Sequence, residues 1–157
     1  MKNDKTDNHE QIFWEEIDRL FPDMIKAIAS LSKKSYLSIT NLRTGITWWS
    51  ERAMDYFGMK ENYTIRSMEK ANRKIHPDDV ATFKRGFKER VDGKNLDTAW
   101  EYRIQDGDSY NRFNAMARVL YDEQKQPFII IIRYDNYGIS DEVDSVTGLY
   151  TEPALNR

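Results

Sequence analysis

The sequence predicts an α+β fold in which helices cover one face of a five-stranded antiparallel sheet. Residues 128–132 (Phe-Ile-Ile-Ile-Ile) are apolar without alternation, which is typical of a central strand buried on both faces. Residues 96–104 and 109–121 alternate apolar and polar side chains on either side of a turn, which predicts two antiparallel strands. Residues 9–31 carry apolar side chains three and four positions apart, which predicts an amphipathic helix.

The N-terminal helix should kink or restart near residues 21–23, because Pro22 lacks a backbone N–H and crowds the preceding turn. Two shorter helices are the alternative. We expect this segment to cover the second face of the isoleucine strand, which otherwise lacks a cover. Its apolar surface is wider than such a cover needs and extends to Phe13, Trp14, Phe21 and Ile25. The excess predicts a homodimer; in the alternative, Phe13 and Trp14 pack on the chain's own strands.

The first two strands are expected at residues 36–41 and 46–50, which are rich in β-branched and aromatic residues and flank a turn with Gly45. A short helix over residues 51–57 should end at Gly58, since glycine suits the left-handed position after a helix.

A longer helix is expected to start near Ile75 and to run to about Val91. Pro77 suits the first helical position, and the acids after it suit the first turn. We expect Asp79 to reach back to a free backbone N–H there. Gly93 ends this helix, and the turn at residues 105–108 joins the two long strands.

Composition excludes several function classes. The 157 residues suit one domain with short extensions. The absence of cysteine excludes disulfides, thiolate metal sites and a cysteine nucleophile. A net charge of −2 offers no surplus for binding phosphates, so we expect no nucleic-acid partner. No apolar stretch approaches the length of a membrane span, and the polar N-terminus does not resemble an export signal, so we expect a cytoplasmic location and no membrane in this chain.

Four local patterns resemble PAS domains that carry a His-Pro-x-Asp motif. They are Trp-Trp-Ser-Glu at 48–51 followed by Tyr-Phe-Gly at 56–58, Ile-His-Pro-Asp-Asp at 75–79, Glu-Tyr-Arg-Ile at 101–104 with its turn, and Asp135 at the end of the fifth strand. Their order and spacing cover about residues 35–135. The resemblance implies a sensor fold with strand order 2-1-5-4-3.

A second resemblance lies near the C-terminus. Asp-Ser-Val-Thr-Gly-Leu-Tyr at 144–150, with Ala154 and Leu155 beyond, is similar to the opening of GGDEF diguanylate cyclase domains. Thr151 and Glu152 depart from that family's usual Asn and Arg. The two resemblances imply four segments: a helical extension (1–34), a PAS domain (35–136), a short linker (137–143) and the start of a GGDEF domain (144–157). Many PAS–GGDEF proteins have a long helical linker instead.

Aromatic and small residues between sheet and helices could line a ligand pocket, as in other PAS folds. The candidates are Trp48, Met54, Phe57, Trp100, Phe113, Ala115 and Ala117. Core packing is the alternative for all seven, although two alanines beside Phe113 leave space that larger residues would fill. The sequence requires no cofactor and does not identify one.

Catalytic and metal sites are not expected. His76 beside two acids fits a helix start better than a metal or haem site, because metal sites need several converging ligands. The acids around Gly107 fit a hairpin turn better than a cation site. Together with this, the two resemblances imply a non-enzymatic chain that senses a cue and regulates a following cyclase domain in cis. The alternative is a ligand-free dimerisation module.

Overall fold

The structure is a computed structural model that describes residues 4–32, 35–65 and 67–139. Its contacts divide the chain into two compact units, Met1–Lys33 and Lys34–Arg157, and each unit is described by itself. The motif at 144–150 lies outside the described residues. None of the helices within the described residues combines the length and the apolar character that a membrane crossing requires.

The N-terminal unit contains two helices joined by one short turn of 3₁₀ helix. Helix α1 (Asp4–Ile17) is followed by η1 (Asp18–Leu20) and α2 (Phe21–Ser30). Pro22 lies in the first turn of α2, where its missing N–H interrupts no hydrogen bond. The helix therefore breaks just before the predicted position, and the segment forms the two shorter helices of the alternative prediction.

Large apolar side chains are exposed along this unit. The rings of Phe13 and Trp14 pack edge to face at 5.0 Å, yet both side chains are about half exposed or more. Phe21, Ile28 and Leu31 are exposed as well. Such a row on one helical unit is more apolar surface than isolated exposed residues usually provide.

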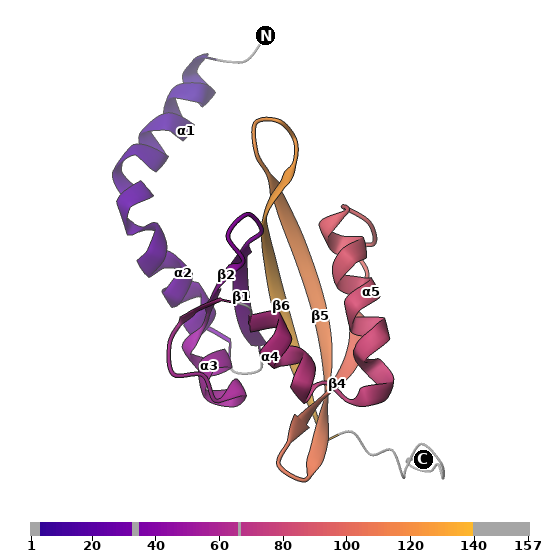
Figure 1. Cartoon of the computed structure of the whole chain (residues 1–157). Helices are drawn as coiled ribbons and strands as arrows, with labels where there is room; N and C mark the ends of the chain where they lie inside the picture. The colour runs from indigo at the N-terminus through magenta and orange to yellow at the C-terminus, as the bar shows by residue number, and fades with distance from the viewer. Residues whose placement is uncertain (1–3, 33–34, 66, 140–157) are drawn as a thin grey trace, which may run out of the picture. The chain divides into compact units, whose positions relative to one another are not determined.

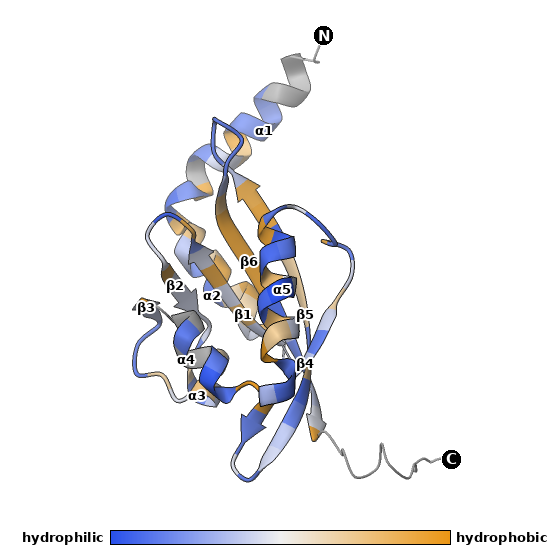
Figure 2. Cartoon of the chain, turned by 45° about the vertical axis from the view of Figure 1, so that its right-hand side comes forward, coloured by the Kyte–Doolittle hydropathy of each residue, from blue (hydrophilic) through white to orange (hydrophobic). Residues whose placement is uncertain are grey.

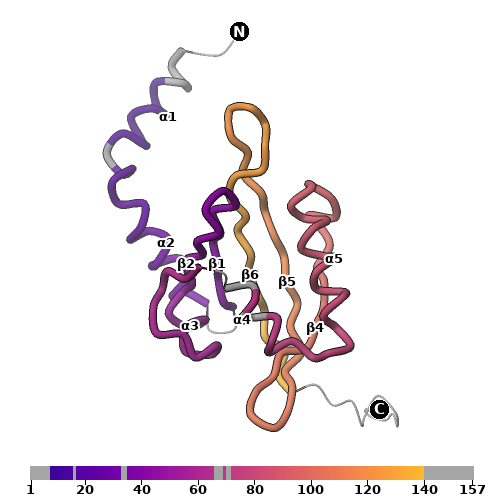
Figure 3. The backbone as a smooth tube through the Cα atoms, in the orientation of Figure 1, coloured from indigo at the N-terminus to yellow at the C-terminus, as the bar shows by residue number. Residues whose placement is uncertain are grey.

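The second unit is built on one antiparallel sheet. Its strands are β1 (Ser35–Asn41), β2 (Ile46–Trp49), β3 (Tyr63–Ile65), β4 (Trp100–Asp106), β5 (Ser109–Tyr121) and β6 (Pro127–Ile139), in the order β3-β2-β1-β6-β5-β4. Figure 1 shows the strands side by side, and the long β5–β6 hairpin can be followed in Figure 3. The α+β fold with a single antiparallel sheet is as predicted.

The prediction of five strands in the order 2-1-5-4-3 is wrong. Among the described residues the sheet has six strands, because β3 pairs with β2 at the edge. Three residues are too few to show an alternating pattern in the sequence. The pairing is reinforced just before β3, where the Trp49 N–H donates to the Asn62 carbonyl at 2.8 Å and the Asn62 side chain donates back to the Trp49 carbonyl at 2.9 Å.

Two strand boundaries also differ from prediction. Strand β4 begins at Trp100 rather than at Leu96, because Asn95 adopts a positive φ of 55° and its carbonyl accepts from the Thr98 N–H in a turn. Strand β6 continues to Ile139, well past the end that the resemblance implied near Asp135 and into the predicted linker of residues 137–143.

The isoleucine strand is central, as predicted. Strand β6 pairs with β1 on one side and with β5 on the other. Ile130 and Ile132 are fully buried, whereas Ile129 and Ile131 are half-buried on the opposite face. The hydrophobic stretch of β6 is visible in the middle of the sheet in Figure 2.

Helices of the second unit lie on one face of the sheet, as predicted and as Figures 1 and 2 show. They are α3 (Glu51–Phe57), α4 (Ser67–Lys74), η2 (Pro77–Asp79) and α5 (Val80–Val91). The Ser50 hydroxyl caps α3 by accepting from the Ala53 N–H, and Gly58 ends the helix with a φ of 68°.

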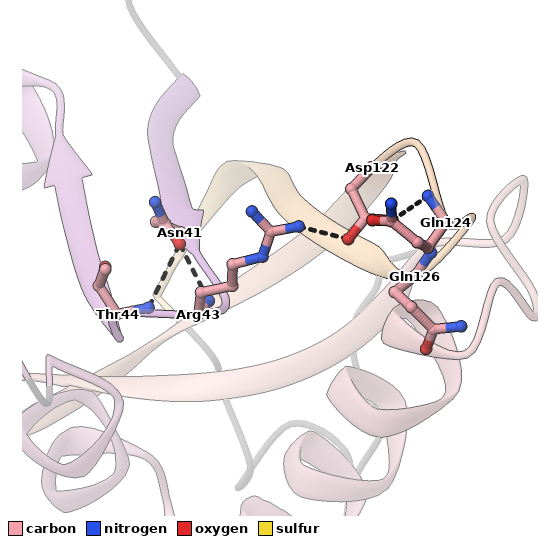
Figure 4. A network of polar contacts seen from close by, with 6 residues as sticks. All are labelled: Asn41, Arg43, Thr44, Asp122, Gln124 and Gln126. Carbon is pink, nitrogen blue, oxygen red and sulfur yellow. Dashed lines mark hydrogen bonds and ion pairs between the residues drawn. The ribbon is translucent and has the colours of Figure 1, made fainter.

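Two turns are tied together at one end of the sheet (Figure 4). The Asn41 side chain accepts from backbone N–H groups of the β1–β2 turn, including that of Arg43 at 2.9 Å. The Arg43 guanidinium lies 4.1 Å above the Phe128 ring and forms an ion pair with Asp122, which begins the β5–β6 turn. Asp122 in turn accepts from backbone N–H groups of its own turn. The ion pair links the β1–β2 turn to the β5–β6 turn.

Candidate functional site

The interior between sheet and helices holds a row of aromatic side chains. Phe113 on β5 is fully buried, and its ring centre lies 5.8 Å from that of Tyr36 and 5.4 Å from that of Tyr56. Trp49 on β2 contacts the rings of Phe57 and Tyr134.

The inner face of strands β1 and β2 also carries buried hydroxyl groups. Thr40 and Thr47 are buried, and their hydroxyl oxygens lie 2.7 Å apart. Ser38, also buried, shares a hydrogen bond of 3.1 Å with the hydroxyl of Tyr134. Next to Thr47 across the sheet stands Thr64 of β3, whose hydroxyl accepts from the indole N–H of Trp49 at 3.0 Å. A line of hydroxyls thus crosses the core face toward the β3 edge.

Five of the seven predicted pocket residues belong to this core. They are Phe57, Trp100, Phe113, Ala115 and Ala117. Met54 packs against the core from α3. Trp48 does not lie with them. In the sheet Trp48 pairs with Ile39, whereas Trp49 pairs with the buried Ser38. Because adjacent strand residues point to opposite faces, Trp49 faces the core and Trp48 faces away from it. A bound ligand among the seven residues stays a prediction.

A cavity of about 480 Å³ lies between α3, β3 and the end of α4. It is lined by Phe57, Gly58, Met59, Lys60, Glu61, Thr64 and Lys74. Of these, the sequence analysis identified only Phe57 as a candidate. Residues 58–61 form a turn after α3, and Lys74 is the last residue of α4, so no sequence pattern marks them as neighbours. Only the unexpected pairing of β3 brings Thr64 up to the end of α3.

Two polar groups in the core have no hydrogen-bond partner within the described part of the chain. They are the Tyr102 hydroxyl and the indole N–H of Trp100, both on β4. Burial raises the pKa of Tyr102 well above its ordinary value, and the nearby Tyr134 adds to the shift. Burial also raises the pKa of Tyr134 to about 12, although the hydrogen bond with Ser38 partly opposes this. Both tyrosines are therefore neutral at physiological pH.

These two buried tyrosines give a matched pair of variants. Tyr102→Phe should raise the free energy of unfolding by about 1–3 kcal/mol, because it removes a buried hydroxyl that makes no hydrogen bond. Tyr134→Phe should lower it by about 1 kcal/mol, because Ser38 loses its partner. Urea denaturation of both variants measures the difference. A loss of stability in Tyr102→Phe comparable to that in Tyr134→Phe would show that the Tyr102 hydroxyl has a bound partner.

The start of the long helix is fixed to β4 by a charged contact. Both carboxylate oxygens of Asp79 accept from the Arg103 guanidinium, at 2.7 and 2.9 Å, and one also accepts from the Arg103 backbone N–H. These bonds, chiefly those from the Arg103 side chain, lower the pKa of Asp79. The expectation that Asp79 caps the helix is wrong, because its carboxylate is directed across to the strand.

His76 makes the cap instead. Its ring nitrogen Nδ1 accepts from the Asp78 N–H at 3.1 Å, and its ring packs against Tyr110 at 4.7 Å. Its backbone N–H donates to the Arg103 carbonyl. The described residues contain no cluster of three or more His, Cys, Asp or Glu side chains that could hold a metal ion.

A buried cation holds the other end of this helix. The Arg90 guanidinium lies 4.1 Å above the Trp100 ring and donates to the carbonyls of Gly86 and Thr98. A Cβ atom at Gly86 would lie 2.9 Å from the same ring, so glycine is needed for this close approach. Both ends of α5 are thus anchored to β4 or to the loop before it.

The fold and its interior can now be compared with known proteins. The sequence profile described as the PAS fold matches residues 46–132, more than half of the chain. The chain belongs to the PAS fold family. In this PAS fold, the aromatic row and the adjoining cavity lie on the face of the sheet that the helices cover. No curated protein shows a significant match.

Solved PAS structures resemble this chain at low sequence identity. A sensory box histidine kinase/response regulator from Burkholderia thailandensis is 16% identical with a TM-score of 0.55, over 74% of this chain and 83% of that chain. The N-terminal domain of a diguanylate cyclase with PAS/PAC sensor from Marinobacter aquaeolei is 15% identical with a TM-score of 0.55, over 67% and 96%. An RNA-binding light-oxygen-voltage receptor is 8% identical with a TM-score of 0.52, over 76% and 32%. These likenesses establish the fold alone.

Proposed function

We propose that this chain is a cytoplasmic regulatory sensor module that controls cyclic di-GMP synthesis by a diguanylate cyclase domain that follows it. The PAS domain itself is non-catalytic. The observation that carries the proposal is the cyclase-like motif at residues 144–150, directly after the PAS domain. The diguanylate cyclase from Marinobacter aquaeolei, whose N-terminal domain is among the structures similar to this chain, supports the same pairing of domains.

The sheet offers a continuous route from the cavity to the downstream domain. Strand β3 forms part of the cavity wall and pairs with β2, which pairs with β1, which pairs with β6. Strand β6 leads directly toward the motif at residues 144–150. A ligand that shifts β3 can thus act on the exit of the domain through hydrogen-bonded strands. Two cyclase domains would then meet differently and change the rate at which two GTP molecules are joined.

A ligand-free dimerisation module is the second candidate. The exposed apolar residues of the N-terminal unit, among them Phe13, Trp14 and Leu31, favour it, since a second copy of the chain could cover them. In this case the PAS domain would hold two output domains together without sensing a small molecule.

A fusion protein tests the regulatory function. Residues 1–143 are joined to an active GGDEF domain, and cyclic di-GMP formation from GTP and magnesium is compared with that of a fusion that starts at Ser32. We expect at least a roughly fivefold difference in rate, which corresponds to a coupling of about 1 kcal/mol. The chain of 157 residues without a fused domain should form no product.

Equal rates in the two fusions would contradict regulation through the N-terminal unit. If the unfused chain forms product and this activity persists after repurification, the proposal that the chain is non-catalytic is contradicted. Lys94→Gln in the longer fusion serves as a control, because Lys94 is an exposed loop residue outside the cavity, and its rate should be unchanged.

A further inference from the structure

The cavity beside β3 carries more positive than negative charge. Its walls hold two ammonium groups, Lys60 and Lys74, against one carboxylate, Glu61. Within the described residues neither lysine forms an ion pair, and Glu61 forms none with them although it lines the same cavity. Two cations that share a concave surface with a single carboxylate leave one net positive charge there, which favours an anionic occupant.

The floor of the cavity is apolar. Phe57 is almost fully buried and its ring packs at 5.4 Å from that of Trp49, so its position is fixed by the core. Met59 adds a flexible thioether side chain that adapts to different shapes. A bare inorganic anion would use the lysines but would leave this floor without a partner.

One wall contributes a directed hydrogen-bond donor. The Thr64 hydroxyl oxygen accepts from the Trp49 indole N–H, so its own proton is directed to another acceptor. Because Thr64 lines the cavity, a carboxylate oxygen there can accept this proton while the lysines neutralise its charge. A volume of about 480 Å³ is within the range of small-molecule sites.

We propose that this cavity binds a small monocarboxylate with an apolar body. The carboxylate lies between Lys60, Lys74 and the Thr64 hydroxyl, and the apolar body lies on Phe57 and Met59. That this ligand is the regulatory cue rests on the sensor function proposed above, whereas its binding does not. The site differs from the seven residues predicted from sequence, with which it shares only Phe57.

Three related probes test whether binding needs both the apolar body and the carboxylate. Phenylacetate has both a ring and a charge, phenylacetamide keeps the ring without the charge, and acetate keeps the charge without the ring. Each is titrated into the ¹⁵N-labelled chain up to about 10 mM, which detects even weak binding. We expect saturable shifts of the backbone amide signals of residues 57–64 and 74 with phenylacetate only.

Charge variants then locate the carboxylate. Lys60→Gln and Lys74→Gln should each weaken phenylacetate binding about tenfold or more, because each removes one charge-assisted hydrogen bond. Lys74→Arg, which keeps the charge, should retain most of the affinity. Lys94→Gln should bind as the unaltered chain does, because Lys94 lies outside the cavity. None of these residues is buried, so all four variants are expected to fold, which thermal denaturation checks.

Three results would overturn the proposal: no saturable binding of phenylacetate, equal binding of phenylacetamide or acetate, or affinities of both glutamine variants equal to that of Lys94→Gln. The fusion assay separates this outcome from failure of the proposed function. A fusion whose rate depends on residues 1–31, together with absent phenylacetate binding, contradicts the carboxylate site alone. Phenylacetate binding with equal rates in both fusions, and with no change in either rate when phenylacetate is added, contradicts the regulatory function alone.

Discussion

Replacing Phe113 by alanine is expected to lower the free energy of unfolding by about 3–5 kcal/mol, the usual range for a large aromatic residue in a well-packed core. Phe113 is fully buried, and two tyrosine rings contact it from β1 and α3. Ala115, the next residue on the same face of β5, is too small to fill the space that the ring would leave. Urea denaturation followed by tryptophan fluorescence measures the effect.

Tyr137→Ala is the matched control, because Tyr137 is an aromatic strand residue that is largely exposed. Its replacement should change the free energy of unfolding by less than about 0.5 kcal/mol. A similarly small effect of Phe113→Ala would show that the ring borders an open pocket rather than a packed core. That result would favour the ligand site predicted around Phe113, Ala115 and Ala117.

Replacing Ile130 by alanine should lower the free energy of unfolding by about 2–5 kcal/mol. Ile130 lies in the central strand with no exposed surface, and its strand neighbours Thr40 and Val119 are buried as well. A central strand paired on both sides has little freedom to relax around a deletion. The midpoint of urea denaturation, with an unchanged slope, reports the loss.

Ile139→Ala near the end of the same strand provides the comparison, since Ile139 is exposed. It removes the same atoms from a site where they bury little area, so the expected loss is below about 1 kcal/mol. Should Ile130→Ala lose no more than Ile139→Ala, the isoleucine run would not form the core.

The elements with strong local signals were predictable from sequence. The unalternating run of residues 128–132 predicted a central strand because apolar side chains on both faces are typical of the middle of a sheet, and β6 does lie between β1 and β5. The strand Ser109–Tyr121 and the helix Glu51–Phe57 with Gly58 after it agree with their predicted bounds. In each case the pattern of apolar residues or the terminating residue reflects the local backbone directly.

Features that depend on tertiary contacts were not predictable. Strand β3 forms because the edge of β2 needs hydrogen-bond partners, and its three residues carry no periodic signal of their own. The choice between Trp48 and Trp49 for the core is a matter of register, which shifts every side chain to the other face when it changes by one residue. Asp79 binds Arg103 on a strand 24 residues away, a contact without a local pattern.

The candidate cavity was missed for a related reason. Phe57 was predicted as a pocket residue because it is aromatic, but Lys60 and Lys74 are ordinary polar residues in the sequence. They meet only because α3, β3 and α4 converge. The pocket predicted among the aromatic core residues was reasoned from residue size and type, which do not reveal whether a space between side chains is filled.

Association of two copies is central to the proposed function, since a cyclase must bring two nucleotide sites together, and the exposed apolar side chains of the N-terminal unit are its candidate interface. Sedimentation velocity of the whole chain, of a chain starting at Ser32 and of the whole chain carrying Phe13→Ser and Trp14→Ser tests it most directly. At a concentration on the order of tens of micromolar, the whole chain is predicted to sediment as a dimer and both altered chains as monomers. If the whole chain is a monomer, or if the altered chains dimerise equally well, the N-terminal unit does not join two copies, and the dependence of the fusion's rate on this unit is contradicted.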